Sequence, residues 1–298
     1  MKKYLFVLST LVLFAFCSCQ KFAGDPISKD FTIEGTYTEL QVENAFDVTV
    51  SDAVSQITVT AGENIMPKVI VEIVDNTLKI RLKPLANNYG SDMTVILPYN
   101  ADLTSVDLSG ASEFHSEYGL EGEKVEVELS GASDFYCDID ADEIKIELSG
   151  ASNFHGKAVA DKAEINMSGS SDYFGDVLAD EIDMDLSGSS SIEGNVSANT
   201  LELDLSGASD ATLMGQVTRL EIDLEGASNI IRKVVGKRYA LVCDTCEGSM
   251  SGSSDAYIHC DGTIKVNLSG GSELHFTGDA FTADSTTSGG SKISHDVL

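Results

Sequence analysis

A short phrase, Leu-Ser-Gly-Ala-Ser or a close variant, occurs ten times in this chain of 298 residues. The copies begin at Leu108, Leu129, Leu148, Met167, Leu186, Leu205, Leu224, Met250, Leu268 and Thr287. Most neighbouring copies are 19 residues apart, and the other spacings are 21, 26 and 18. A fixed period in this range is typical of a solenoid, in which each repeat forms one coil stacked on the next.

Each repeat has the residue pattern of a β-strand that leads into a corner. Before the phrase, apolar and polar residues alternate, as in Val125-Glu126-Val127-Glu128-Leu129, which is the pattern of a half-buried strand. After the phrase, one further apolar column is filled by Phe114, Phe135, Phe154, Tyr173, Ile192 and Ile230. The pattern predicts an all-β protein, a parallel β-helix of about ten coils. We expect it to be right-handed, as parallel crossovers usually are.

Two positions of the phrase do not vary among the ten copies, a Gly (Gly110 to Gly289) and a Ser (Ser112 to Ser291). The Gly predicts a corner that needs a positive φ or leaves no room for a Cβ atom. The Ser is expected to point inward and to bond backbone, or the Ser of the next coil, through its hydroxyl. Ten copies of one nucleophile make no chemical sense, so we interpret the Ser column as structural.

The N-terminus resembles the leader of a bacterial lipoprotein. Residues 1–18 combine Lys2 and Lys3 with an apolar core and a small residue, Ser18, directly before Cys19. We expect Cys19 to be lipidated and residues 19–30 to form a tether, which would anchor the exported chain in the outer membrane, facing the periplasm or the exterior. An ordinary secretory signal is the alternative.

The chain is strongly acidic, with a formal net charge of −29. Such a field repels nucleic acid and anionic lipid and keeps a solenoid soluble, so we expect no nucleic-acid partner. Much of the charge falls in one outward column: Asp107, Glu128, Glu147, Asp185, Asp204 and Asp223. Because stacked like charges destabilise a ladder, bound Ca²⁺ is one interpretation, and a solvated acidic face is the other.

Apart from Cys17 and Cys19, the cysteines are at positions 137, 243, 246 and 260. In an exported protein a disulfide is expected, either between Cys243 and Cys246 or from one of them to Cys260. Zinc binding by these three cysteines and His259 is the alternative. His259 and Cys260 are neighbours on a strand and should point to opposite faces, which argues against zinc. We therefore predict no metal site and no cofactor.

The region before the repeats, residues 31–100, has short alternating segments and lacks the repeated phrase. Asp75-Asn76-Thr77 predicts a tight hairpin turn that leads into Leu78-Lys79-Ile80-Arg81-Leu82. We expect residues 31–100 to form an all-β cap and residues 101–298 to form the β-helix, with 31–298 as one continuous domain.

These pieces together resemble the GIN head domain of auto-transporter adhesins, a family of bacterial exported proteins. The resemblance rests on Ala45-Phe46-Asp47-Val48-Thr49-Val50, on Gly62-Glu63-Asn64, on Asp75-Asn76-Thr77-Leu78-Lys79-Ile80 and on the repeated phrase. It implies adhesion, but the family motif carries no catalytic residues. No alternating, aromatic-flanked barrel segment follows the repeats, so we expect the chain not to be an autotransporter itself.

Two classes of function compete for a β-helix of this kind, and the fold alone does not decide between them. The first is a non-enzymatic surface or periplasmic adhesin or scaffold. The second is a carbohydrate-active enzyme, a polysaccharide lyase or hydrolase, or a glycan-binding protein. The chain has no Trp to stack on sugars, and its repeats contain only three arginines, Arg219, Arg232 and Arg238. We therefore favour the non-enzymatic class, with no catalytic residue.

An aromatic stripe is the candidate binding surface. The residues seven positions after the first four copies of the phrase are His115, Tyr136, His155 and Phe174, and they are expected to face outward. Exposed aromatic residues are common interface anchors, so the stripe predicts contact with a glycan or a protein surface. The structural alternative is that these rings cover neighbouring coils or lie under the cap.

Overall fold

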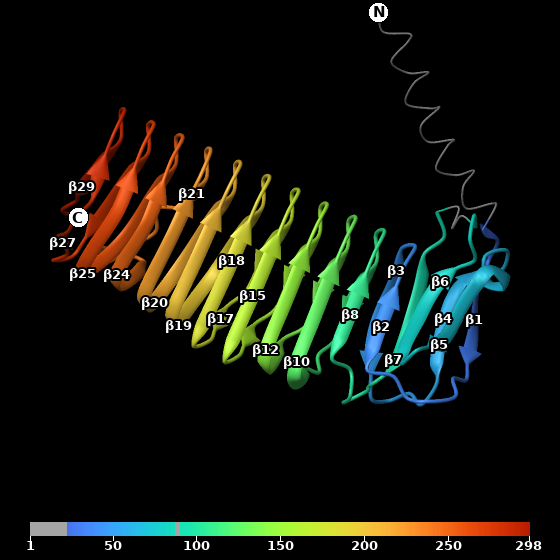
Figure 1. The fold of residues 1–298 in the computed structure, drawn as a ribbon. Helices are drawn as coiled ribbons and strands as arrows, with labels where there is room; N and C mark the ends of the chain where they lie inside the picture. Colours follow the sequence, from blue (N-terminus) through green and yellow to red (C-terminus); the bar gives the residue numbers. More distant parts are fainter. Residues whose placement is uncertain (1–22, 87–89) are drawn as a thin grey trace, which may run out of the picture. The chain divides into compact units, whose positions relative to one another are not determined.

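The structure is a computed structural model that describes residues 23–86 and 90–298, and the regular secondary structure of these residues is almost entirely β-strand (Figure 1). The chain divides into two compact units, Met1–Tyr118 and Gly119–Leu298. The leader of residues 1–18 and Cys19 lie outside the described residues.

In the described part of the first unit, residues 23–86 and 90–118, there are nine strands and one short 3-10 helix. The strands are β1 (Pro26–Phe31), β2 (Glu39–Val42), β3 (Phe46–Ser51), β4 (Ile57–Gly62), β5 (Val69–Val74), β6 (Thr77–Leu82), β7 (Met93–Pro98), β8 (Ser105–Leu108) and β9 (Glu113–His115), and η1 (Met66–Lys68) precedes β5. Strands β5 and β6 pair antiparallel, with Val74 opposite Thr77. The two residues between them, Asp75 and Asn76, have φ angles of 51° and 72°, as a two-residue hairpin turn of the I′ type requires. The predicted hairpin is confirmed.

The first unit also contains parallel pairs that resemble coils of the repeats. Strand β2 pairs with β8, with Val42 opposite Leu108, and strand β3 pairs with β9, with Asp47 opposite Glu113. Between β2 and β3 the chain turns through Asn44 and Ala45, whose φ angles are 73° and 67°. A Cβ added at Gly110 would lie 3.3 Å from the backbone nitrogen of Asn44. This segment is therefore a corner of the repeat type without the repeated phrase.

The second unit is built from the remaining strands. They are β10 (Leu120–Leu129), β11 (Asp134–Tyr136), β12 (Ile139–Leu148), β13 (Asn153–His155), β14 (Ala158–Val159), β15 (Lys162–Met167), β16 (Asp172–Phe174), β17 (Val177–Leu178), β18 (Glu181–Leu186), β19 (Ser191–Leu205), β20 (Asp210–Leu224), β21 (Asn229–Ile230), β22 (Val234–Val235), β23 (Arg238–Tyr239), β24 (Leu241–Met250), β25 (Asp255–Leu268), β26 (Glu273–Thr277), β27 (Phe281–Thr282), β28 (Thr286–Thr287) and β29 (Lys292–His295).

Apart from the short strands β22 and β23, the strands of the second unit pair in parallel with the equivalent strands of the neighbouring repeat. The first residues of the phrase therefore form one continuous column: Leu129, Leu148, Met167, Leu186, Leu205, Leu224, Met250, Leu268 and Thr287. The predicted fold class, an all-β parallel solenoid with a spacing of about 19 residues, is confirmed. The repeat of 26 residues accommodates its extra length in an antiparallel hairpin, β22 with β23.

The invariant Gly has the predicted backbone conformation. Its φ angle lies between 71° and 81° in every copy of the second unit. From Gly150 to Gly289, a Cβ atom would lie only 2.3–2.7 Å from the carbonyl oxygen of the Gly one coil earlier. The corner therefore excludes every other residue for two reasons, a left-handed backbone and direct backbone contact between coils.

The invariant Ser points inward, as predicted. From Ser133 to Ser272 it is at most 1% exposed. Its hydroxyl donates to the carbonyl oxygen three residues earlier at 2.7–3.1 Å in each copy of the second unit. In one pair of coils the hydroxyls of Ser171 and Ser190 also lie 3.4 Å apart. Each Ser thus stabilises its own corner through a hydrogen bond within that corner, which is a structural role.

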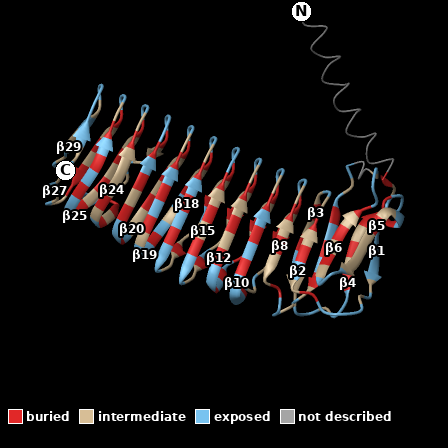
Figure 2. Ribbon diagram, viewed as in Figure 1, coloured by how far each residue is buried: buried red, intermediate tan, exposed pale blue. Residues whose placement is uncertain are grey.

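The interior of the second unit follows the predicted alternation, visible as alternating buried and exposed bands along the strands (Figure 2). Behind each corner the rings of Phe135, Phe154 and Tyr173 stack, with centroids 5.0 and 4.7 Å apart. All three side chains are fully buried. The register thus places like residues on like residues throughout the core.

Two adjacent glycines allow a matched test of the corner. In Gly270 a Cβ would lie 2.5 Å from the carbonyl oxygen of Gly252 at a φ of 72°, whereas in Gly271 the nearest atom is 3.7 Å away and φ is not left-handed. We expect Gly270→Ala to lower the free energy of unfolding by at least about 2 kcal/mol. Gly271→Ala should be neutral or slightly stabilising, since most copies have a larger residue there. Urea unfolding of both variants checks this, and equal effects would contradict it.

Candidate functional site

Three of the four predicted aromatic residues form one outward column of the second unit. Tyr136, His155 and Phe174 are in register on β11, β13 and β16. Their ring centroids are 4.6 and 5.0 Å apart and the ring planes are tilted by only 4° and 14°. The fourth residue, His115, lies on β9 in the first unit.

This stacking limits how the column can contact a ligand. The faces of His155 are covered by Tyr136 on one side and Phe174 on the other, so the column presents ring edges to the solvent. Phe174 is the most exposed member, at 38%, and its register neighbour in the next coil is Glu193. Stacking on a sugar requires an open ring face, whereas edges and one half-open ring suit packing against side chains. The geometry also agrees with the alternative that these rings have a purely structural role, because each ring covers the ring of the neighbouring coil.

Beside the rings lies a polar column whose members alternate between acceptors and donors. Asn153 donates to Asp134 at 2.6 Å, and Asn229 donates to Asp210 at 2.8 Å. Between these pairs, the hydroxyl of Ser191 donates to Asp172. Each of these carboxylates therefore has an amide or hydroxyl partner from the next coil. In this column, hydrogen-bond donors from the next coil compensate the negative charge of the carboxylates.

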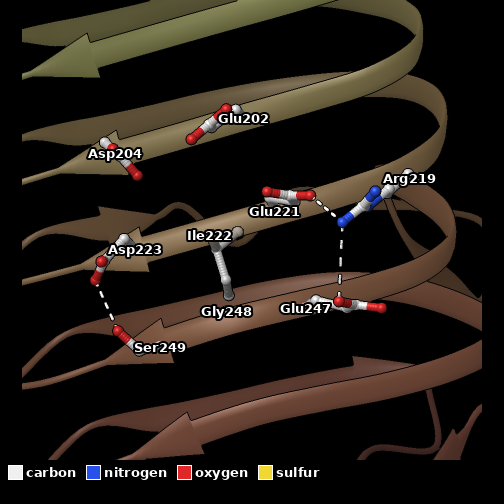
Figure 3. A pocket seen from close by; sticks show the side chains of 9 residues that line it. All are labelled: Glu202, Asp204, Arg219, Glu221, Ile222, Asp223, Glu247, Gly248 and Ser249. Carbon is white, nitrogen blue, oxygen red and sulfur yellow. Dashed lines mark hydrogen bonds and ion pairs between the residues drawn. The ribbon is translucent and has the colours of Figure 1, made fainter.

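In the acidic column predicted from the sequence, the carboxylate of Asp204 lacks that compensation. Asp185, Asp204 and Asp223 are directly in register on consecutive coils. Asp204 and Asp223 border a shallow hollow that is also lined by Glu202, Glu221 and Glu247 (Figure 3). Arg219 pairs with Glu221 and lies 3.9 Å from Glu247, and Ser249 donates to Asp223 at 2.8 Å. The carboxylate of Asp204, in the middle, has only acidic neighbours in register.

The pKa of Asp204 shows the effect of this arrangement. Partial desolvation, followed by the charges of Asp223, Glu202 and Asp185, raises it from 3.8 to about 6. The site can therefore attract cations and repel anions, and it weakens the fold when fully ionised. The three column members face the solvent, as a solvated acidic face requires.

The cysteines of the second unit lie inside the solenoid. Cys243 and Cys260 are register partners on β24 and β25, and both side chains are buried, as is that of Cys246. Burial raises the pKa of Cys246. His259 points away from Cys260, with its Nε2 atom 3.3 Å from Asp261 and its Nδ1 atom 2.9 Å from Thr277. His259 and Cys260 thus point to opposite faces of the strand, as expected. The disulfide among the cysteines stays a prediction.

One cluster was not anticipated from the sequence. Of the residues that the structure describes, Asp47, Glu113 and His115 bring three metal-ligating side chains within 4.8 Å of one another. Burial raises the pKa of Asp47, and Glu113 raises it further, whereas His115 lowers it. The sequence signal that could have predicted this cluster is the segment Val42 to Phe46, which has the same five-residue length as the repeated phrase. Because Val42 lies opposite Leu108, the equal length places Asp47 opposite Glu113.

A solenoid of this kind is a repeat protein that displays rings and charges in columns on its coils. The chain matches, over residues 36–193 and again over 174–280, the family described as "Putative auto-transporter adhesin, head GIN domain". These matches span most of the chain, so the protein belongs to this family, and the resemblance is confirmed. The family is described by adhesion and not by an enzymatic activity.

Several solved structures are similar to the chain. A "putative adhesin" from Parabacteroides distasonis is 18% identical, with 92% of this chain and 98% of that chain covered and a TM-score of 0.49. A "putative lipid binding protein" from the same species is 18% identical, with 92% and 97% covered and a TM-score of 0.46. A "putative adhesin" from Parabacteroides merdae is 15% identical, with 92% and 97% covered and a TM-score of 0.45.

No curated protein matches the chain at the significance required. Within residues 23–86 and 90–298, no helix is both long and apolar enough to cross a membrane.

The raised pKa of Asp204 predicts a pH-dependent stability. A carboxyl group that holds its proton more tightly in the folded state destabilises the fold as the pH rises from about 4 to about 6. Asp204→Asn should therefore raise the melting temperature at pH 7 by about 1–3 °C, allowing for solvent screening, and should have no effect at pH 3.5.

The matched control is Asp210→Asn, because Asp210 accepts a hydrogen bond from Asn229. That variant should not stabilise the protein at pH 7. Thermal unfolding across this pH range measures both variants, and the same gain from Asp210→Asn would contradict the assignment.

Proposed function

We propose that the protein is a non-enzymatic lipoprotein of the cell envelope that uses its acidic solenoid to adhere to a protein surface. Membership of the adhesin family supports the adhesive role. The observation that carries the choice of ligand is the column of Tyr136, His155 and Phe174, in which stacking leaves edges and not faces for contact. Ring edges pack against the side chains of a protein surface, and a basic partner is attracted by the net charge of −29.

The acidic columns give this proposal a second physical basis. Outward carboxylates on neighbouring coils, such as Asp185, Asp204 and Asp223, create a negative field along the coils. This field accelerates encounters with a basic partner and is weakened by salt. The rings would then supply short-range packing after the encounter. A glycan ligand is the competing outcome. It would depend on an open ring face, which the outer side of Phe174 could provide in this column.

The ring column can be tested by replacing its two outer members. We expect Tyr136→Ser with Phe174→Ser to reduce binding to basic host-matrix proteins by at least tenfold, because the apolar anchors are lost while the charge is unchanged. Phe281→Ser is the matched control, since Phe281 is 70% exposed but lies outside the column.

Surface plasmon resonance at two salt concentrations, together with a glycan array, measures the outcome. Equal binding by the double variant and the wild type would exclude the ring column. Loss of glycan binding without an effect on proteins would instead favour a glycan ligand.

The proposed anchor rests on the sequence alone. The apolar leader, Ser18 and Cys19 support lipidation at Cys19, with the residues up to 30 as a tether. We expect Cys19→Ala to move the protein from the membrane fraction to the soluble fraction, and labelling with a fatty-acid analogue should be lost as well. Cys17→Ala is the control and should change neither, because bulky Phe16 precedes Cys17. Unchanged fractionation of Cys19→Ala would refute the anchor.

A further inference from the structure

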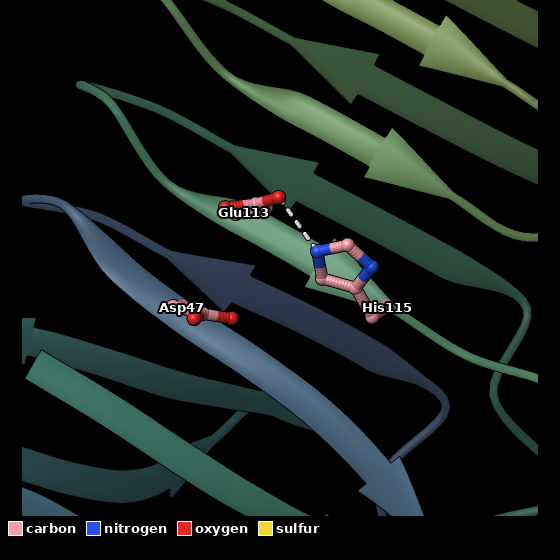
Figure 4. Close-up of side chains that lie close together, drawn as sticks. All are labelled: Asp47, Glu113 and His115. Atoms are coloured by element: carbon pink, nitrogen blue, oxygen red, sulfur yellow. Dashed lines mark hydrogen bonds and ion pairs between the residues drawn. The ribbon is translucent and has the colours of Figure 1, made fainter.

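The cluster of Asp47, Glu113 and His115 is built by two neighbouring parallel strands of the first unit. Asp47 on β3 is the register partner of Glu113 on β9, so the two carboxylates stand side by side. His115 lies two residues beyond Glu113 and therefore projects from the same face of the sheet. Figure 4 shows the three side chains converging, with the Nε2 atom of His115 2.6 Å from the Oε1 atom of Glu113.

The donor atoms indicate which ion would suit the cluster. One imidazole nitrogen and two carboxylate oxygens form a mixed set, whereas Ca²⁺ and Mg²⁺ prefer oxygen ligands alone. Three protein ligands that leave a fourth position open are typical of accessible zinc sites. Two carboxylates in register repel each other, and one imidazole does not balance them, so a divalent cation would remove an unfavourable interaction.

We propose that Asp47, Glu113 and His115 bind one divalent transition-metal ion of the zinc class. The three ligand atoms already lie within 4.8 Å of one another. Neighbouring ligands of a tetrahedral ion with bonds of about 2.0–2.1 Å are roughly 3.3 Å apart, so binding needs only small side-chain rotations. The ion would replace the direct contact between Glu113 and His115. The side chains of these two residues are 37% and 40% exposed, which leaves the site open to solvent.

The second unit contains the same Glu-x-His pattern in a different setting. Glu273 lies 3.0 Å from the Nε2 atom of His275, but Asp296 lies 3.0 Å from the Nδ1 atom on the other side of the ring. Two carboxylates on opposite ring nitrogens cannot bind one ion together with that imidazole. Lys292 is also the register partner of Glu273 and supplies a positive charge there. This pair is therefore a natural control for the proposed site.

The test is zinc binding by the full chain, purified without a polyhistidine tag. We expect isothermal titration with Zn²⁺ to show one site per chain, and Co²⁺ to give the visible absorption of a tetrahedral site. His115→Gln, Glu113→Gln and Asp47→Asn should each weaken the affinity at least tenfold. The double variant Glu273→Gln, His275→Gln should bind as the wild type does.

Each variant is first compared with the wild type by circular dichroism and thermal unfolding in the absence of metal, and three independent substitutions guard against one that fails to fold. The proposal is overturned if the wild type binds no Zn²⁺. It is equally overturned if all three single variants keep the wild-type affinity, or if only the Glu273, His275 control loses it. Ca²⁺ binding that displaces Zn²⁺ at equal concentration would also refute the assignment to a transition metal.

Discussion

The corner of each coil is the constraint on which the rest of the solenoid depends. Its Gly lies in the left-handed region and packs so closely on the corner below that a Cβ atom would overlap a backbone oxygen. The Ser two residues later closes the same corner from inside by donating to the carbonyl oxygen three residues before it. Because consecutive corners touch backbone to backbone, the strands on both sides are held in one register.

A common register turns each position of the repeat into a column, and the chemistry of the column follows from its residues. Rings stack on rings inside the solenoid, where flat surfaces fill the space between coils without voids. Outside, the same rule places carboxylates on carboxylates. Where donors alternate with acids, as at Asp134 and Asn153, each carboxylate has a hydrogen-bond partner. Where they do not, as around Asp204, desolvation and the neighbouring negative charges raise the pKa of the carboxyl group. The register makes such columns of like charge unfavourable, and the same columns can attract ligands of opposite charge at the surface.

The sequence predicted the parts of the fold that depend on local rules. The positive φ of the Gly, the buried Ser, the apolar columns and the Asp75–Asn76 turn all follow from residue type and spacing. The corner at Asn44 and Ala45 was missed because it has neither Gly nor Ser, although Asn tolerates the same backbone region. The cluster of Asp47 with Glu113 and His115 was missed for the same reason, since only that corner sets the register between β3 and β9. The position of the ring column was predictable, but the tilt that covers the ring faces was not, because it depends on side-chain packing between coils.

The alternation of acid and donor beside the rings has a period of two coils, although the backbone repeats with every coil. Asp134, Asp172 and Asp210 occupy one phase, and Asn153, Ser191 and Asn229 occupy the other. Removing a single coil between them would leave the backbone stack intact but would bring two members of one phase together, carboxylate against carboxylate or donor against donor. Removing two coils would preserve every pairing. In this stretch, coils must therefore be added or removed in pairs if every carboxylate is to keep a donor beside it.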